Sequence, residues 1–451
     1  MANHYYRQYR GEHVCVDANA ESGDRSISKG EAQFHFTEFQ CGALPCSKFP
    51  SNREVPCVVC SRERVGGTTY VHWGKKSCPS PSQLVYSGHA AGAKSSEQGG
   101  GANPLCLDGS PSYDLQYSDD DQDGARLYGV KYGTSGYGLG GSFSSVSSYT
   151  IPCAVCFTSS VYSITMVSGR GDCPRDWKIE YSGYLFAAHY SHYKSNWVCI
   201  DGKPDTLSYH SGSGGWWYPT EIECGSISCD NVEGRYSQNK EVSCAVCSAD
   251  SERNSVVYTR WGRSDCPAGS RVAYAGQAVG SHYNSQTGSG ANVLCLHTRA
   301  LFGLYDVSNH DGARLYGYEY EPGGLRDQAL TSLGNHEVSC AVCETMGARS
   351  SFTIFGSYIC PTGYHSDYTG YMFAHYYGGS SQHKGEFICI DQDPQSYGQR
   401  GSSGDDQALL YAVELTLLFL DHIIHIKEEA ITMSAWQLNP RDIMRIPITV
   451  I

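Results

Sequence analysis

Short runs of β-branched and aromatic residues alternate along the chain with clusters of small and polar residues. Two such runs are Thr69–Trp73 and Val256–Arg260. Runs of this composition favour strands, and the Gly, Ser, Asn and Asp clusters between them favour turns. No segment with helical periodicity and capping residues occurs before residue 396. The pattern therefore predicts an all-β fold.

Cysteines recur along the chain in a fixed order of spacings. A second set, about 187 residues after the first, has nearly the same spacings, which indicates an internal repeat. The two sets are Cys57, Cys60, Cys78, Cys106, Cys153, Cys156, Cys173 and Cys199, then Cys244, Cys247, Cys266, Cys295, Cys340, Cys343, Cys360 and Cys389. The sequence of residues 123–129 also recurs unchanged at 311–317. We therefore expect copies of one cysteine-rich module in tandem.

A weaker period of about 95 residues runs inside each copy. Cys78-Pro79 and the Tyr-Ser-Gly sequence of residues 86–88 are echoed by Cys173-Pro174 and by residues 181–183. Each module is therefore predicted to consist of two similar halves.

The cysteine positions divide the chain into four segments. Residues 66–247 form an intact module with ten cysteines, an even number that can pair completely. Residues 1–60 match the C-terminal part of a module, and residues 254–395 match a module that lacks its C-terminal part. Residues 396–451 contain no cysteine and are rich in Leu and Ile. We expect them to be an unrelated tail with a short helix, of the kind that an error in a gene model produces.

The ten cysteines of the intact module are candidate disulfide residues. They are Cys78, Cys106, Cys153, Cys156, Cys173, Cys199, Cys224, Cys229, Cys244 and Cys247. Cys-x-x-Cys pairs also occur in redox sites at helix N-termini and in zinc sites with a second close pair, but these pairs lie in strand-like sequences and their nearest partners are single cysteines. We therefore expect structural disulfides, with Cys153 and Cys156 joined to Cys78 and Cys106 in either order.

Composition limits the compartment and the partners. Twenty-one cysteines in repeated register are typical of an oxidising, extracellular compartment, although the first residues contain no apolar run that could be the core of a signal peptide. The formal charge of −13 comes from scattered carboxylates, and no block of Lys or Arg could follow a phosphate backbone. We expect secretion, no nucleic-acid partner and no membrane span.

An acidic run at residues 119–124 resembles the start of a calcium loop. Asp119, Asp121 and Asp123 are its candidate metal ligands. An EF-hand needs a bidentate Glu at the twelfth loop position, which is Val130 here, so the EF-hand is excluded. A solvated turn is the expected structure, and no metal or other cofactor is predicted.

Two other short motifs are candidate binding sites. Arg170-Gly171-Asp172 precedes Cys173 and could present a cation and a carboxylate for cell adhesion, although the corresponding residues 75–77 and 263–265 lack the motif. Trp216-Trp217-Tyr218 lies in a Gly/Ser-rich stretch and could form an exposed platform for glycans. No Ser/His/Asp set or carboxylate pair repeats with the modules. The sequence therefore predicts no catalytic residues and no enzyme.

The combined cysteine and aromatic spacing resembles a known domain type. The order Tyr-x-x-Trp-Gly-(Arg/Lys)-x-x-Cys-Pro, Tyr-x-Gly, Gly-Gly-Ala-Asn-x-Leu-Cys-Leu, Leu-Tyr-Gly-x-x-Tyr and Pro-Cys-Ala-Val-Cys is similar to the noncollagenous C-terminal domain of the short-chain, spongin-type collagens of invertebrates. The resemblance covers nearly all of residues 4–395. No Gly-X-Y tract accompanies it here, so it implies the extracellular domain without a triple helix.

These observations favour a secreted interaction protein of the extracellular matrix or the cell surface. Its expected partners are matrix proteins, cell-surface receptors or glycans. The alternative is a soluble lectin-like protein that recognises glycans through the Gly/Ser-rich loops and aromatic side chains. The sequence does not specify the oligomeric state.

Overall fold

The computed structural model describes residues 1–4, 10–21, 34–62, 66–113, 120–122, 124–210, 212–229, 236–249, 255–284, 287–301, 308–323, 325, 327–348, 350–376, 385–400 and 407–413. Residues 1–15 and 32–413 belong to one compact unit, and residues 16–31 and 414–451 to another. The strands and disulfides of the described residues lie in the first unit.

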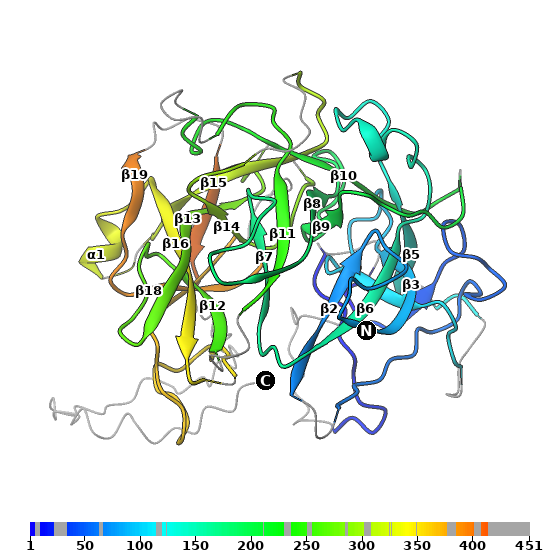
Figure 1. The fold of residues 1–451 in the computed structure, drawn as a ribbon, viewed down its shortest axis with the longest axis horizontal. Helices are drawn as coiled ribbons and strands as arrows, with labels where there is room; N and C mark the ends of the chain where they lie inside the picture. Colours follow the sequence, from blue (N-terminus) through cyan, green and yellow to red (C-terminus); the bar gives the residue numbers. More distant parts are fainter. Residues whose placement is uncertain are drawn as a thin grey trace, which may run out of the picture. The chain divides into compact units, whose positions relative to one another are not determined.

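Strands dominate the described residues, and the all-β class predicted from the sequence is confirmed (Figure 1). The helices in these residues are one 3-10 turn, η1 (Gly141–Phe143), and one α-helical turn, α1 (Gln328–Thr331). Helix α1 begins after Asp327 because that side chain accepts hydrogen bonds from the backbone N–H groups of Ala329 and Leu330.

Three of the four Cys-x-x-Cys sequences form the central strand of a three-stranded arrangement. In the first arrangement, β6 (Pro152–Ser159) lies between β2 (Gly67–Trp73) and β3 (Gln83–Gly92) and pairs with both in antiparallel fashion. Cys153 of β6 stands opposite Gly88 of β3. Because both neighbours hydrogen-bond to it, the central strand is mostly buried.

The same arrangement recurs twice along the chain. The later arrangements, written with the central strand in the middle, are β7 (Ile164–Ser168), β11 (Ser243–Ser248) and β8 (Lys178–Ala187), then β12 (Ser255–Trp261), β16 (His336–Met346) and β13 (Ser270–Gly280). The first cysteine of the central strand again stands opposite a glycine, since Gly183 faces Cys244 and Gly276 faces Cys340. Strands β12, β16 and β13 can be followed in Figure 1.

A short strand and a longer strand accompany each of these three arrangements, and a fourth such pair of strands occurs later in the chain. The short strands are β4 (Leu105–Asp108) beside β3, β9 (Val198–Asp201) beside β8, β14 (Leu294–His297) beside β13, and β18 (Ile388–Asp391) beside β17 (Gly370–Ala374). The longer strands, which pair with the same four neighbours, are β5 (Ala125–Tyr132), β10 (Gly215–Ile222), β15 (Ala313–Glu321) and β20 (Ala408–Ala412).

Parallel pairing joins successive parts of the chain. β1 (Thr37–Phe39) pairs with β5 so that Thr37 faces Ala125, and β10 pairs with β15 so that Thr220 faces Ala313. The same four-residue sequence, Ala-Arg-Leu-Tyr, begins β5 and β15. Repeated sequence therefore gives repeated register.

The predicted boundary at residue 396 does not match the structure. β19 (Ser396–Arg400) pairs with β16, and β20 pairs with β15 in the way that β10 pairs with β5. β20 is a strand where the Leu-rich pattern predicted a helix, because pairing with β15 and burial of Leu410 outweigh a local pattern that suits either structure. The rest of the predicted tail, 414–451, lies outside the described residues.

One hydrophobic core joins the two predicted halves of the intact module, and a second core extends across the predicted boundary between modules. One cluster joins Trp73 and Val130 to Phe186 and Trp217. Another joins Ile222 and other residues of β8–β11 to residues of β13–β15. Successive arrangements therefore bury one another's faces, and residues 32–413 pack as one unit. The division into separate modules stays a prediction.

Nine disulfides cross-link the described residues. Within residues 66–247 they are Cys78–Cys156, Cys106–Cys153, Cys173–Cys247, Cys199–Cys244 and Cys224–Cys229. The others are Cys15–Cys57, Cys41–Cys46, Cys266–Cys343 and Cys295–Cys340. Cys60, Cys360 and Cys389 are free thiols.

Candidate functional site

The Tyr-x-Gly sequence of each arrangement holds the short strand against its neighbour. In the first arrangement the hydroxyl of Tyr86 donates a hydrogen bond to the carbonyl oxygen of Cys106 (3.0 Å). A Cβ atom on Gly88 would lie 1.5 Å from the carbonyl oxygen of Leu107, so only glycine permits this approach of β4 to β3. The approach brings Cys106 to Cys153, which faces Gly88 and forms the disulfide.

This tyrosine–glycine clasp occurs four times in the described residues. The later hydrogen bonds run from Tyr181 to Cys199 (3.1 Å), from Tyr274 to Cys295 (3.3 Å) and from Tyr368 to Cys389 (3.0 Å). The matching glycines are Gly183, Gly276 and Gly370, whose Cβ atoms would lie 1.8, 1.9 and 1.7 Å from a carbonyl oxygen of the short strand. The clasp therefore forms whichever residue lies between its tyrosine and its glycine.

The fourth clasp has no central strand beside it in the described residues. β17 pairs with β18 and β20, whereas β3, β8 and β13 each pair with a Cys-x-x-Cys strand as well. Cys389, which occupies the position of Cys199, is accordingly a free thiol. The clasp residues are nevertheless in place, since Tyr368 also donates to Thr259 as Tyr181 donates to Val71.

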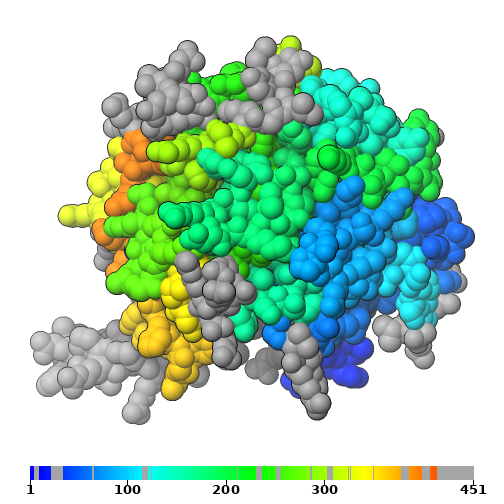
Figure 2. All heavy atoms as spheres, viewed as in Figure 1, coloured from blue at the N-terminus to red at the C-terminus, as the bar shows by residue number. Residues whose placement is uncertain are grey.

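An open groove of about 980 Å³ lies beside β17, the strand that has no Cys-x-x-Cys neighbour in the described residues. Its lining includes residues 350–360, residues 366–372 of the β17 region and residues of β12 and β16, and Cys360 and Cys389 both contribute to it. Phe355 is 48% exposed in this groove, whereas Ser168, at the matching place in β7, is 1% exposed beneath β11. Figure 2 shows part of this region as yellow and gold spheres at the lower left.

The two thiols of the groove differ in their surroundings. Cys360 precedes a proline, as Cys173 does, and Cys173 is bonded to Cys247 of the central strand β11. Burial raises the pKa of Cys389 to about 11, so this thiol stays protonated near neutral pH and is a poor nucleophile. The missing cysteines are evident from the sequence, but the groove is not, because it depends on how β17 and residues 350–360 lie in space.

The candidate adhesion motif forms a closed ion pair. The guanidinium of Arg170 donates two hydrogen bonds to the Asp172 carboxylate (2.5 and 2.6 Å) and a third to the carbonyl of Arg299 (3.0 Å). This pairing lowers the pKa of Asp172. Arg263 pairs with Asp265 in the same way ahead of Cys266, so the Arg-x-Asp geometry belongs to the repeat and does not require Gly171.

The three aromatic residues at 216–218 do not form the predicted exposed platform. They lie in β10, where alternate side chains point to opposite faces. Trp217 is 3% exposed and belongs to the core, with its ring edge-on to Trp73. Trp216 is half-buried beneath the Lys131 ammonium, which lies 4.1 Å from the ring centroid. The Gly/Ser-rich residues before this segment favoured an exposed loop, but the segment is a largely buried strand.

The candidate calcium residues are only partly described. Asp119 and Asp123 lie outside the described residues. Asp121 accepts a hydrogen bond from Arg126 (2.9 Å), and the neighbouring Gln122 N–H donates to Glu38 (2.9 Å). Among the described residues, no group of three or more His, Cys, Asp or Glu is arranged to hold a metal ion.

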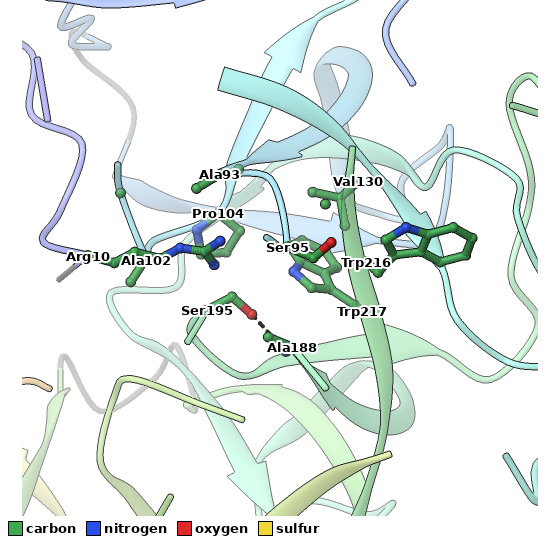
Figure 3. Close-up of a pocket in the computed structure, with 13 residues that line it drawn as sticks. Arg10, Ala93, Ser95, Ala102, Pro104, Val130, Ala188, Ser195, Trp216 and Trp217 are labelled. Atoms are coloured by element: carbon green, nitrogen blue, oxygen red, sulfur yellow. Dashed lines mark hydrogen bonds between the residues drawn. The ribbon is translucent and has the colours of Figure 1, made fainter. Parts of the chain in front are cut away.

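A second cavity, near Arg10, is too small for an organic ligand. It measures about 10 Å³ and is lined by Arg10, Val130, Ser195 and Trp217 among others (Figure 3). A void of this size holds about one water molecule. The Arg10 guanidinium donates to the carbonyls of Tyr193 and Lys194 (2.8 Å each), so this side chain fastens the N-terminal segment to the following arrangements.

A comparison of the chain with known protein families found no match. None of the helices in the described ranges has the length and apolar character needed to cross a bilayer.

Proposed function

We propose that the chain is a secreted, disulfide-stabilised interaction protein of the extracellular matrix or the cell surface, built from domains that resemble the noncollagenous domain of short-chain collagens. The main support is the disulfide framework, because disulfides that fix neighbouring strands persist in oxidising compartments. The exposed apolar groove beside β17 supplies a binding surface, since clusters of exposed hydrophobic side chains are typical of interaction sites.

Matrix retention tests this proposal. The chain would be produced in animal cells behind a heterologous signal sequence, and its distribution between the medium and the deposited matrix would be measured after the cells are removed. We expect most of the protein in the matrix fraction after a high-salt wash. Recovery of all the protein from the medium would contradict the proposal.

The groove can be tested in the same assay. Replacing Phe352 and Phe355 with Ser removes two exposed aromatic side chains from the groove, so matrix retention should fall several-fold. The control is Val272→Ser in β13, which changes a residue of similar exposure outside the groove and should leave retention unchanged. Binding of the purified chain to one glycan class on an array would instead favour the lectin-like alternative, which has lost the aromatic platform as support.

A further inference from the structure

The groove beside β17 has the geometry of a place for one more strand. In each of the three other arrangements a Cys-x-x-Cys strand lies between two neighbours, as β11 lies between β7 and β8. Residues 351–355 and β17 correspond to β7 and β8, because each pair flanks a Cys-Pro sequence and the clasp tyrosine follows that sequence in both. Residues 414–451 contain no cysteine, so they cannot supply the Cys-x-x-Cys strand.

The chain exposes a strand sequence of this type near its N-terminal end. Residues 54–61 read Glu-Val-Pro-Cys-Val-Val-Cys-Ser, and residues 241–248, which include β11, read Glu-Val-Ser-Cys-Ala-Val-Cys-Ser. Val58 and Val59 are 79% and 87% exposed, whereas Ala245 and Val246 at the same positions of β11 are buried. The segment 56–61 therefore carries apolar side chains that suit a central strand and are uncovered.

The free thiols match in the same register. Cys60 occupies the position of Cys247, and Cys360 occupies the position of Cys173. Cys173 and Cys247 form a disulfide, whereas Cys60 and Cys360 are both free within one chain. The other cysteine of the exposed segment is already bonded to Cys15, so Cys389 has no free counterpart on it.

We propose that residues 56–61 of one copy of this chain dock as the central strand beside β17 of a second copy, and that Cys60 of the first copy forms a disulfide with Cys360 of the second. The inference rests on the oxidising setting of the proposed function. The two surfaces are different patches, so the contact is heterologous, and each copy keeps one free donor or acceptor end. Repetition of the contact yields chains or rings of covalently linked copies.

The disulfide forms with an external oxidant of the small-molecule disulfide class, such as oxidised glutathione. The Cys60 thiolate attacks one sulfur of this disulfide, which releases one glutathione thiol and leaves a mixed disulfide. The Cys360 thiolate then attacks the Cys60 sulfur and displaces the second glutathione thiol. The two protein thiols lose two protons and two electrons, and one glutathione disulfide becomes two thiols.

Non-reducing gel electrophoresis of the purified full chain tests the inference. After incubation with oxidised glutathione, we expect a ladder of multiples of the 49.3 kDa chain that collapses to monomer on reduction. Cys60→Ser and Cys360→Ser should each abolish the ladder, whereas Cys389→Ser, at the other free thiol of the groove, should preserve it. Peptide mapping of the dimer band should find Cys60 linked to Cys360.

Mixing the two single variants tests the direction of the contact. The Cys60→Ser chain keeps only the acceptor thiol and the Cys360→Ser chain keeps only the donor thiol, so the mixture should stop at a dimer with one copy of each. A ladder that persists in Cys60→Ser, a Cys60–Cys360 link confined to the monomer band, or no link in the presence of the oxidant would each overturn the inference. Matrix retention without a ladder would leave the proposed function standing.

Discussion

The hydroxyl of Tyr181 donates a hydrogen bond to the carbonyl oxygen of Cys199, and this contact fixes the short strand β9 to β8. The same hydroxyl lies 3.1 Å from the carbonyl of Val71, so one buried side chain links two successive arrangements. Two residues later, Gly183 leaves room for the carbonyl of Ile200. The hydrogen bond and the glycine contact therefore place Cys199 beside Cys244 independently of the disulfide that joins them.

Substitutions in this clasp should separate its hydrogen bond from its steric requirement. Tyr181→Phe leaves a buried carbonyl without its donor and should lower the free energy of unfolding by about 1–2 kcal/mol. Gly183→Ala places a Cβ atom 1.8 Å from the Ile200 carbonyl oxygen and should cost about 1–3 kcal/mol or more. Thermal denaturation under non-reducing conditions measures both. Gly171→Ala, where nothing lies within 4 Å of the added atom, is the control and should change little.

Removal of one framework disulfide should destabilise the chain far more than removal of a free thiol. Cys106 and Cys153 are 47 residues apart in sequence, and replacing both with Ala should cost about 2–5 kcal/mol. Urea unfolding, followed by tryptophan fluorescence, measures this loss. Cys60→Ser should leave the unfolding curve of the monomer unchanged, and a similar loss in both variants would contradict the structural role assigned to the framework.

The fold class and several strand positions could be predicted from local sequence, because β-branched and aromatic runs such as Thr69–Trp73 coincide with strand β2. The order of pairing at Cys153 and Cys156 could not, since it depends on which residue faces each cysteine across the sheet. The burial of Trp217 could not be predicted either, because the Gly/Ser-rich residues before it resemble a loop.

The exposure of the groove beside β17 could not be predicted from the sequence. The missing cysteines after residue 395 were visible by comparison with the intact copy, but exposure of Phe355 depends on the absence of a long-range neighbour. The strand β20 could not be predicted for the same reason, because its pairing with β15 is a contact between residues far apart in sequence. Local composition contains no information about either contact.

A buried carboxylate should make stability depend on pH. Burial, together with the charge of Glu319 on the neighbouring strand, raises the pKa of Glu337 to about 7. Its protonated form is therefore favoured in the folded chain, and its contribution to stability is complete below pH 4.5 and is lost as the pH rises to about 7. At pH 8, Glu337→Gln should have a free energy of unfolding about 1–3 kcal/mol higher than that of wild type, and it should therefore unfold at a higher temperature. At pH 4.5 the two proteins should differ little.

Thermal denaturation across this pH range measures the effect of Glu337. The control is Glu12→Gln, at an exposed carboxylate, which should follow the wild-type profile. A Glu337→Gln profile parallel to that of wild type from pH 4.5 to pH 8 would show that the carboxylate is equally ionised in the folded and unfolded chains.

The Arg170–Asp172 pair leads to an expectation about cell attachment. The Asp172 side chain is 52% exposed, but both of its oxygens accept hydrogen bonds from Arg170, so it is not free to bind a metal ion on a receptor. We expect wild type and Asp172→Glu to support the same level of divalent-cation-dependent attachment on coated surfaces. Arg170→Ala removes the internal partner, and because exposed ion pairs contribute about 0–1 kcal/mol, this variant should fold normally. Attachment that Asp172→Glu abolishes, with its circular dichroism spectrum unchanged, would show that the pair opens on contact with a receptor and would restore the motif as an adhesion site.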